Sequence, residues 1–321
     1  MESNRVSSDT LRYPDMKDTL RIATRESELA LWQARLVQQR LETAWPDLAV
    51  ELVGLSTRGD RITDRPLSEV GGKGLFLSAL ESALENGDAD IAVHSMKDVP
   101  ARIPDHMALP VVLAPASPLD AYVSNQYATP ADLPADSWVG TSSPRRQALF
   151  RRLRPDVQID FLRGNIQTRL RKLDDGHFDA ILLACAGLDR LGMSQRISAR
   201  LTPAQCLPAI GQGVLGIELR ANDGDTREYI EALAETDTTI RIEAERAVAR
   251  HLNGNCYLPI AAHATHDGIR LSLQACVAEA DGSRVIADGI EGPVENAAAL
   301  GAALAERLLA AGANEILRGL A

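Results

Sequence analysis

The sequence contains one pattern twice: a helical segment ends in an acidic turn with a glycine, and a short apolar strand follows. The first copy is ENGDADIAVHS at 85–95 and the second is DDGHFDAILLACA at 174–186. Around each copy, further apolar strands alternate with segments whose apolar residues recur at helical spacing. Such alternation favours a mostly parallel sheet covered by helices. We therefore predict an α/β protein with two similar lobes.

Two segments rich in proline, glycine and small residues flank the second copy: LAPASPL at 113–119 and LPAIGQGVLGIEL at 207–219. Two connections between the same lobes make a hinge beside a cleft. We expect residues 1–113 and 208–235 to form the first domain, and residues 114–207 the second. Residues 236–321 are expected to form a small α+β domain, because a helix, an alternating strand and an Ala/Leu helix follow one another there.

The third domain also yields two local predictions. Its first helix, TTIRIEAERAVARHL, is expected to be capped by Thr238 or Thr239 and to be followed by a left-handed Gly254. The strand IRLSLQACV alternates, so Ile269 and the other odd-numbered positions should face the core. Its even-numbered positions, including Cys276, should face solvent.

The 321-residue chain is acidic, with a formal net charge of -10. This charge argues against a general binder of nucleic acid or of anionic membranes. The first residues carry no apolar run typical of an export signal, and no segment reaches the roughly 18 apolar residues of a membrane span. A cytoplasmic protein is therefore expected, and the lack of an evident exposed apolar stripe favours a monomer. The four cysteines are widely spaced, which suits neither a disulfide framework nor a zinc site, and no metal is predicted.

Positive charge is concentrated between residues 141 and 172, which is unusual in so acidic a chain. Part of this charge lies late in a predicted helix, where the helix dipole already favours cations; these residues are Arg151, Arg152 and Arg154. Arg145 and Arg146 instead open that helix, directly after the strand end GTSS. Together with the free N–H groups and hydroxyls there, they indicate an anion-binding site.

Arginine also follows two other predicted strands. Arg163 stands in FLRGN, and Arg25 stands in RIATRES beside the cap-type residues Thr24 and Ser27; Arg169 lies on the helix after Arg163. The planar fork of arginine binds carboxylate or phosphate through two parallel hydrogen bonds. Arginines at three strand ends therefore predict a ligand with several anionic groups.

Lys97 and Asp98 follow the apolar strand DIAVHSM. Ligands of α/β sheets bind beyond the carboxyl ends of the strands, so this pair is a site candidate, with an exposed turn as the alternative. His94 lies inside the strand, and we interpret it as a core residue. With Asp98 it would supply only two metal ligands, which is a weak basis for a metal site.

Two glycine-rich stretches suggest nucleotide sites at first sight. GQGVLG at 211–216 fits the GxGxxG spacing, but a strand-like segment follows it where a dinucleotide site needs a helix. We expect Gln212 to line the cleft instead. VGGKG at 70–74 lacks the spacing of a phosphate-binding P-loop. The polar segment 57–74 around it is expected to be a mobile lid.

Cys256 lies in the loop LNGNCYLPI, just past the predicted end of a helix. The negative end of the helix dipole should raise the pKa of a thiol placed there, so the surroundings do not indicate an activated nucleophile. Two interpretations stay open from the residues alone. Cys256 is either a spare loop cysteine or a thiol that reacts with a strong electrophile.

Eight blocks of the sequence, taken in order, resemble the porphobilinogen deaminase (hydroxymethylbilane synthase) family. They are RIATRESELALWQA, STRGDRITDRPLSEVGGKGLF, DIAVHSMKDVP, VGTSSPRRQ, LRGNIQTRL, AGLDRLG, LPAIGQGVLGIE and the Cys256 loop with its following Leu-Pro-Ile. The resemblance runs from about Leu20 to Ile260, and residues 1–18 lie outside it. Of these blocks, HSMKDVP, TSSxRRQ and LPAIGQG are together very specific.

The resemblance implies two lobes like those of type-2 periplasmic binding proteins around a cleft, with a small third domain. It implies a transferase that deaminates four porphobilinogen molecules and adds them head to tail to a dipyrromethane cofactor. Hydrolysis then releases hydroxymethylbilane, a precursor in tetrapyrrole and haem biosynthesis. The family attaches the cofactor through a thioether to the cysteine that matches Cys256.

The resemblance also assigns site residues, with Asp98 as the catalytic carboxylate. The implied cofactor-binding residues are Cys256, Lys97, Asp98, Ser143, Arg145, Arg146, Arg169 and Gln212. The implied substrate-binding residues are Arg25, Ser27, Arg163, Arg169 and Arg190. The chain departs from the family at Pro144, where an apolar residue such as leucine is usual. It also departs at Asn255 and Tyr257, where glycine and glutamine are frequent.

Two other functions fit part of the sequence. A non-catalytic sensor of a small polycarboxylate would explain the arginines but would leave Asp98 and Cys256 without a role. Nucleic-acid binding through RRQALFRRLR is opposed by the overall charge and by the lack of stacking aromatics in that region. For the enzyme, replacing Arg145 or Arg146 by leucine should impair cofactor assembly more than thermal stability.

Overall fold

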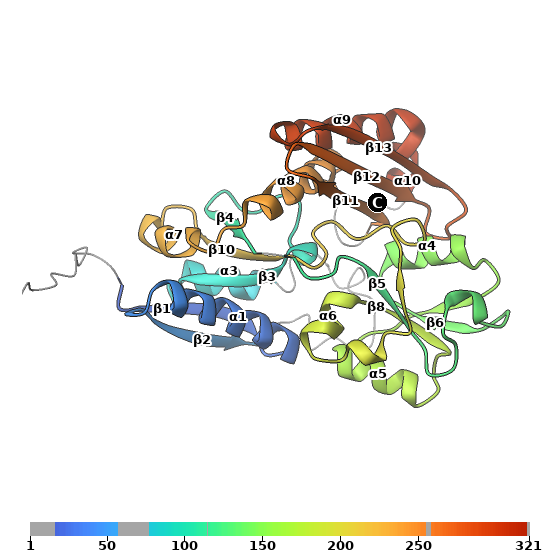
Figure 1. Cartoon of the computed structure of the whole chain (residues 1–321), viewed down its shortest axis with the longest axis horizontal. Coiled ribbons are helices and arrows are strands. Elements are labelled where there is room, and N and C mark those ends of the chain that lie inside the picture. Colours follow the sequence, from blue (N-terminus) through green and yellow to red (C-terminus); the bar gives the residue numbers. More distant parts are fainter. Residues whose placement is uncertain (1–16, 57–76, 114, 255–257, 320–321) are drawn as a thin grey trace, which may run out of the picture.

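The computed structural model describes residues 17–56, 77–113, 115–254 and 258–319 (Figure 1). The predicted lid at 57–74 therefore lies outside the described residues. The same holds for Cys256 and its neighbours Asn255 and Tyr257. The description below concerns the four described segments alone.

The first lobe is built on a five-stranded sheet with the order β2-β1-β3-β10-β4. Strand β1 pairs in parallel with β2 and β3, whereas β10 is antiparallel to both β3 and β4. The strands are β1 (Thr19–Arg25), β2 (Ala49–Leu55), β3 (Ile91–Ser95), β4 (Met107–Val112) and β10 (Leu215–Arg220). The helices of this lobe are α1 (Glu28–Ala44), α3 (Ser78–Glu85) and α7 (Gly224–Glu231).

The second lobe repeats this arrangement with the order β7-β6-β8-β5-β9. Strand β6 pairs in parallel with β7 and β8, and β5 is antiparallel to β8 and β9. The strands are β5 (Asp120–Val123), β6 (Trp138–Gly140), β7 (Gln158–Asp160), β8 (Ala180–Ala184) and β9 (Ala199–Leu201). The helices are α4 (Pro144–Leu153), α5 (Ile166–Asp174) and α6 (Cys185–Arg190). The prediction of two similar α/β lobes is confirmed.

The chain crosses between the two sheets twice. It leaves the first sheet after β4 and enters the second at β5, and it returns between β9 and β10. In each sheet the strand that follows the crossing is the one antiparallel to its neighbours. Figure 1 shows the result: β10 and α7, in yellow and orange, lie among the blue and cyan elements of the first lobe.

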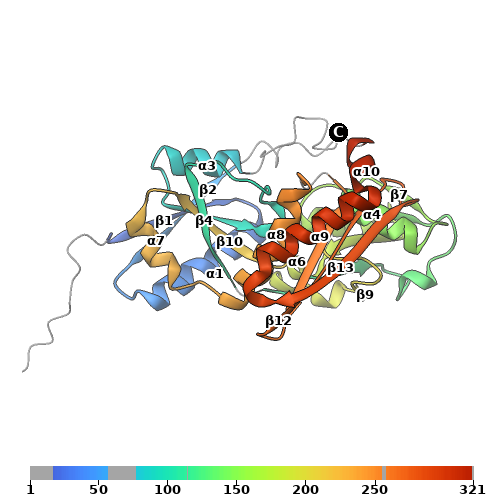
Figure 2. The same ribbon diagram turned by 90° about the horizontal axis from the view of Figure 1, so that it is seen from above.

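The remaining sheet has three antiparallel strands, β11 (Ile260–His266), β12 (Arg270–Ala278) and β13 (Val285–Pro293). Its helices are α8 (Thr236–His251), α9 (Ala297–Leu308) and α10 (Asn314–Gly319). Figure 2 shows α9 running across this sheet, and the core between them includes the fully buried Leu271, Leu273 and Leu304. The predicted small α+β unit is thus confirmed. None of the helices in the described segments has the length and apolar character that a bilayer crossing requires.

The predicted N-cap of α8 and the predicted left-handed residue after its end are both wrong. The helix begins at Thr236 with Glu235 as its N-cap, two residues before Thr238. Its left-handed residue is Asn253, with a φ of 50°, and Gly254 has no positive φ. Gly254 is needed for space instead, because a Cβ there would lie 2.9 Å from Cδ1 of Ile260.

The two faces of β12 also differ from the predicted pattern. Ile269 is 75% exposed because it precedes the strand, which begins at Arg270. Cys276, expected in solvent, is buried in a cluster with Phe150 of the second lobe. This face of the third sheet is therefore an interface with the second lobe, which an alternating pattern cannot distinguish from a solvated face.

Candidate functional site

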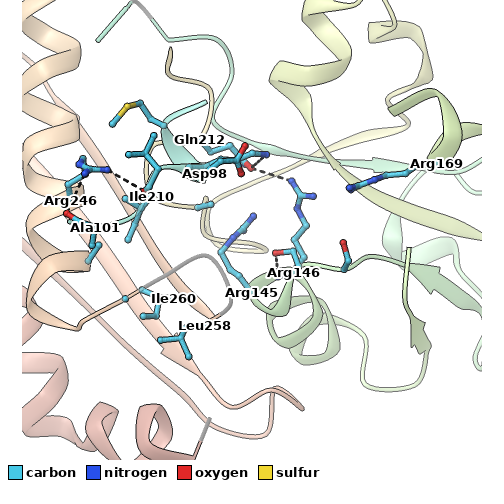
Figure 3. Close-up of a pocket in the computed structure, with 18 residues that line it drawn as sticks. Asp98, Ala101, Arg145, Arg146, Arg169, Ile210, Gln212, Arg246, Leu258 and Ile260 are labelled. Carbon is cyan, nitrogen blue, oxygen red and sulfur yellow. Dashed lines mark hydrogen bonds between the residues drawn. The ribbon is translucent and has the colours of Figure 1, made fainter. Parts of the chain in front are cut away.

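A cavity of about 230 Å³ lies where the two lobes meet the third domain (Figure 3). Residues of both lobes and of the third domain line it. They are Met96, Lys97, Asp98, Val99, Ala101, Ser142, Ser143, Arg145, Arg146, Arg169, Ala209, Ile210, Gln212, Arg246, Ala249, Gly254, Leu258 and Ile260. Six of the predicted cofactor-binding residues share this cavity with Asp98.

Asp98 ends a single 3-10 turn, Met96–Asp98, that directly follows β3. Backbone hydrogen bonds hold this turn: Met96 N–H donates to Val214 at 2.9 Å, and Val99 N–H donates to Met96 at 3.2 Å. Met96 is buried as the anchor, whereas the side chain of Asp98 is exposed toward the cavity. The strand end thus presents a carboxylate on a fixed backbone.

Lys97 is half-buried beside Asp98, and its Nζ lies 3.5 Å from Oε1 of Gln212. Burial lowers the pKa of Lys97 to about 8, and the positive charge of Arg146 adds to this shift. The ammonium is therefore less stable here than in water. An anionic group brought into the cavity would stabilise it.

Arg145 and Arg146 begin α4, with Pro144 as its first residue and Ser143 as the N-cap. Both arginines turn to Asp120, a fully buried carboxylate at the start of β5. Arg145 donates to its two oxygens at 2.6 and 3.0 Å, and Nε of Arg146 donates to Oδ1 at 2.8 Å. Pro144 is compatible with this position, because the first helical residue needs no N–H partner.

The cluster of Asp120, Arg145 and Arg146 keeps a net positive charge, since one carboxylate opposes two guanidinium groups. Burial alone would raise the pKa of Asp120, but the attraction of the two arginines is larger and holds it well below its usual range. Within the described segments, Nε of Arg145 has no hydrogen-bond partner.

Gln212 connects this cluster to the returning segment of the chain. Its amide donates to Asp120 Oδ1 at 3.0 Å and to the Pro118 carbonyl at 2.6 Å, while its oxygen accepts from Arg146 at 3.2 Å. Gln212 is 2% exposed and lines the cavity, as predicted. The glycines around it precede β10, so a strand follows them where a dinucleotide site needs a helix.

Arg169 reaches the cavity from α5, and its Nε donates to the Gly164 carbonyl at 2.8 Å. Burial lowers the pKa of Arg169 to about 10, and the charges of Arg146 and Arg163 act in the same direction. Even so, a guanidinium group with this pKa stays protonated at neutral pH. Several cations therefore share the cavity and repel one another. An anionic ligand bound among them would reduce this repulsion.

The other predicted substrate-binding residues do not line the cavity among the described residues. Ser27 caps α1 by accepting from Ala30 N–H at 3.4 Å. Arg190 donates to the Gly213 carbonyl at 2.6 Å, and its guanidinium lies 5.7 Å from the ring centroid of Trp32. Arg163 is buried after β7, and Arg25 ends β1.

Two residues of the site were missed from the sequence. Asp120 holds both α4 arginines, and Arg246 of α8 lines the cavity. In Figure 3, Arg246 and the α4 arginines lie on opposite sides of Asp98. Asp120 is a charged residue at the start of the apolar strand DAYV, which was a signal that it needs a partner. The sequence contains no comparable signal for Arg246, because its helix carries charge on several faces.

Gly254, Leu258 and Ile260 also line the cavity. They flank residues 255–257 on both sides, so the two ends of the Cys256 loop open onto the same space as Asp98. His94 lies elsewhere: it is 7% exposed, with Nε2 2.8 Å from Glu218. The interpretation of His94 as a satisfied core residue is confirmed.

The fold and the cavity define a class: a two-lobed α/β protein with a third domain, whose shared cavity is suited to a ligand with several carboxylates. The chain belongs to the porphobilinogen deaminase family. The family model "Porphobilinogen deaminase, dipyromethane cofactor binding domain" matches residues 20–228, and "Porphobilinogen deaminase, C-terminal domain" matches residues 239–310. This confirms the family, the transferase class and the dipyrromethane cofactor that the sequence predicted.

One relative with high sequence identity agrees with this family. A porphobilinogen deaminase from Chromobacterium violaceum is 50% identical over 300 residues, which are 94% of this chain and 97% of that protein. The periplasmic aliphatic sulphonate binding protein SsuA from Escherichia coli is 16% identical, with a TM-score of 0.40 over 74% of this chain and 71% of its own. A nutrient binding protein from Burkholderia cenocepacia, bound to methionine, is 14% identical, with a TM-score of 0.43 over 67% and 91%.

Proposed function

We propose that the cavity is the active site of a hydroxymethylbilane synthase. In this reaction four porphobilinogen molecules lose ammonia and are joined head to tail on a dipyrromethane attached to Cys256. The observation that carries the proposal is that Asp98, four arginines and both ends of the Cys256 loop line one cavity. A sensor of polycarboxylates would need the arginines but neither the carboxylate nor the loop.

The charges of the cavity fit the cofactor. A dipyrromethane carries acetate and propionate groups, and the cations of the cavity can pair with these carboxylates. We assign its binding to Lys97, Ser143, Arg145, Arg146, Arg169 and Gln212, with Cys256 as the attachment site. When bound, the cofactor supplies the free pyrrole carbon to which the first substrate unit is joined.

Asp98 has the catalytic role in this proposal. Loss of ammonia from porphobilinogen leaves a resonance-stabilised cation, and one fixed carboxylate can stabilise that charge as it develops. The same carboxylate can accept and return protons at the pyrrole nitrogens. The exposed position of Asp98 on a rigid turn supports both tasks.

Substrate carboxylates are assigned to Arg25, Ser27, Arg163, Arg169 and Arg190. We also propose the domain division 1–113 with 208–235, 114–207 and 236–321, which the membership of the three sheets supports. A monomeric, cytoplasmic enzyme completes the proposal.

The covalent attachment is tested by intact-protein mass spectrometry. We expect the purified protein to carry the mass of two linked pyrroles, and peptide mapping should assign it to Cys256. The buried Cys185, Cys206 and Cys276 serve as internal controls and should be unmodified. Cys256→Ser should lack the adduct and all turnover. Fully active protein with an unmodified Cys256 would contradict the proposal.

The lowered pKa of Lys97 predicts a pH dependence of cofactor assembly. In the empty cavity Lys97 loses its charge as the pH rises through about 8, so cofactor-free protein should load porphobilinogen more slowly above that pH. Lys97→Arg should move this decline to higher pH, because guanidinium stays protonated. Adduct formation is followed by mass at several pH values. Identical profiles for the two proteins would exclude Lys97 as the titrating group.

A further inference from the structure

Two consecutive side chains of α8 reach out of the third domain to the backbone of the first lobe. Glu245 is 2% exposed, and its Oε2 accepts from Gly211 N–H at 2.7 Å. Its other oxygen accepts from Ala264 N–H of β11 at 2.9 Å, and His263 Nδ1 lies 3.5 Å from it. One carboxylate thus joins the third sheet to the segment that carries Gln212.

Arg246 makes the second connection, to the segment that follows Asp98. Its guanidinium donates to the carbonyls of Val99, Pro100 and Ala101 at 3.4, 2.9 and 3.3 Å. Burial lowers the pKa of Arg246 to about 10, and the charge of Arg250 adds to this shift. Figure 3 shows the guanidinium next to Ala101, on the far side of Asp98 from Arg169.

The two segments held by α8 also contact each other. Gly211 has a φ of +70°, and a Cβ there would lie 2.7 Å from Cβ of Met96 and 3.3 Å from N of Lys97. A displacement of Gly211 toward Met96 therefore presses on the turn that ends in Asp98. Since Gln212 follows Gly211 directly, the same displacement moves the amide that binds Asp120 and Arg146.

We propose that Glu245 is a positioning residue for catalysis, assisted by Arg246, and that it fixes Asp98 and Gln212 relative to the helix that leads to Cys256. This inference rests on the proposed function, because it assumes that the attachment site and the carboxylate act on the same chain of pyrroles. Reactive groups must meet within a few tenths of an ångström, and a misplacement of about 1 Å can cost roughly 100-fold in rate. Glu245 touches no reacting atom, so it acts only through the two segments.

Glu245→Gln tests this. The N–H groups of Gly211 and Ala264 each need an acceptor oxygen, and glutamine has only one. The NH2 group of the glutamine must therefore face one of these two N–H donors. We expect kcat, counted per cofactor-loaded molecule at a temperature where the variant is folded, to fall about 10- to 100-fold with little change in KM. Glu243→Gln, an exposed glutamate of the same helix, is the matched control and should behave like wild type.

Arg246→Lys provides a second route if Glu245→Gln does not fold. Lysine keeps the charge but cannot bind three carbonyls in one plane, so a similar fall in kcat is expected, with Arg227→Lys on α7 as its control. A purely structural role would lower the melting temperature and leave kcat per loaded molecule unchanged, and that result would overturn the inference. Wild-type protein without a pyrrole adduct would instead refute the proposed function.

Discussion

Asp98→Asn is expected to keep the fold and to reduce the turnover of porphobilinogen by at least about 100-fold. Asparagine has nearly the same shape but can neither carry the negative charge nor accept a proton. The turn itself should survive, because backbone hydrogen bonds from Met96 and Val99 hold it. Steady-state kinetics on cofactor-loaded protein measure the effect, and thermal unfolding checks the fold.

Asp105→Asn is a suitable control for this variant, because Asp105 is exposed a few residues further along the chain and outside the cavity lining. It should turn over porphobilinogen as the unmodified chain does. If Asp98→Asn is equally active, the carboxylate has no catalytic role, and stabilisation of the developing cation must come from another group.

Arg145→Leu should be strongly destabilising, by about 3 kcal/mol or more, because it leaves the buried Asp120 with only part of its compensation. The sequence alone predicted an effect mainly on cofactor assembly. The two hydrogen bonds to Asp120 give Arg145 a structural role as well. We therefore expect Arg145→Leu to reduce both cofactor assembly and stability. Urea unfolding of the cofactor-free proteins measures the structural part separately.

A double variant separates the buried charge from simple loss of packing. Asp120→Asn in the Arg145→Leu background should recover part of the lost stability, because it removes the uncompensated charge. Since the pKa of Asp120 is lowered in the folded state, its contribution is present at neutral pH and is lost only as the solution becomes strongly acidic. Arg145→Leu protein that unfolds at the wild-type urea concentration would contradict this account.

Much of the fold was predictable because its pattern is local. Helix α4 begins directly after the strand end GTSS, as the sequence indicated, and both crossings fall in the Pro- and Gly-rich segments. The strand-end positions of Asp98, Arg145 and Arg146 followed from the same alternation. Their gathering around one cavity was predictable because ligands bind beyond the carboxyl ends of the strands, and the two crossings place the two sheets beside one cleft.

Contacts between distant segments were not predictable in this way. Asp120 lies 25 residues before Arg145, outside the basic segment, and only the pairing of β5 with β8 brings it beneath α4. The buried face of β12 has the same origin, since Cys276 packs on the second lobe. A single sequence shows which face of an element is polar or apolar, but not which neighbour will cover it.

The position of β10 has a consequence for synthesis on the ribosome. This strand lies between β3 and β4, with Ile217 fully buried, yet it comes from residues 215–220. The second sheet, by contrast, is complete once β9 ends at Leu201. Domains made from an uninterrupted segment can fold as soon as they emerge, whereas the N-terminal lobe must wait with an open gap in its sheet. We therefore expect the second lobe to complete its sheet before the first lobe does.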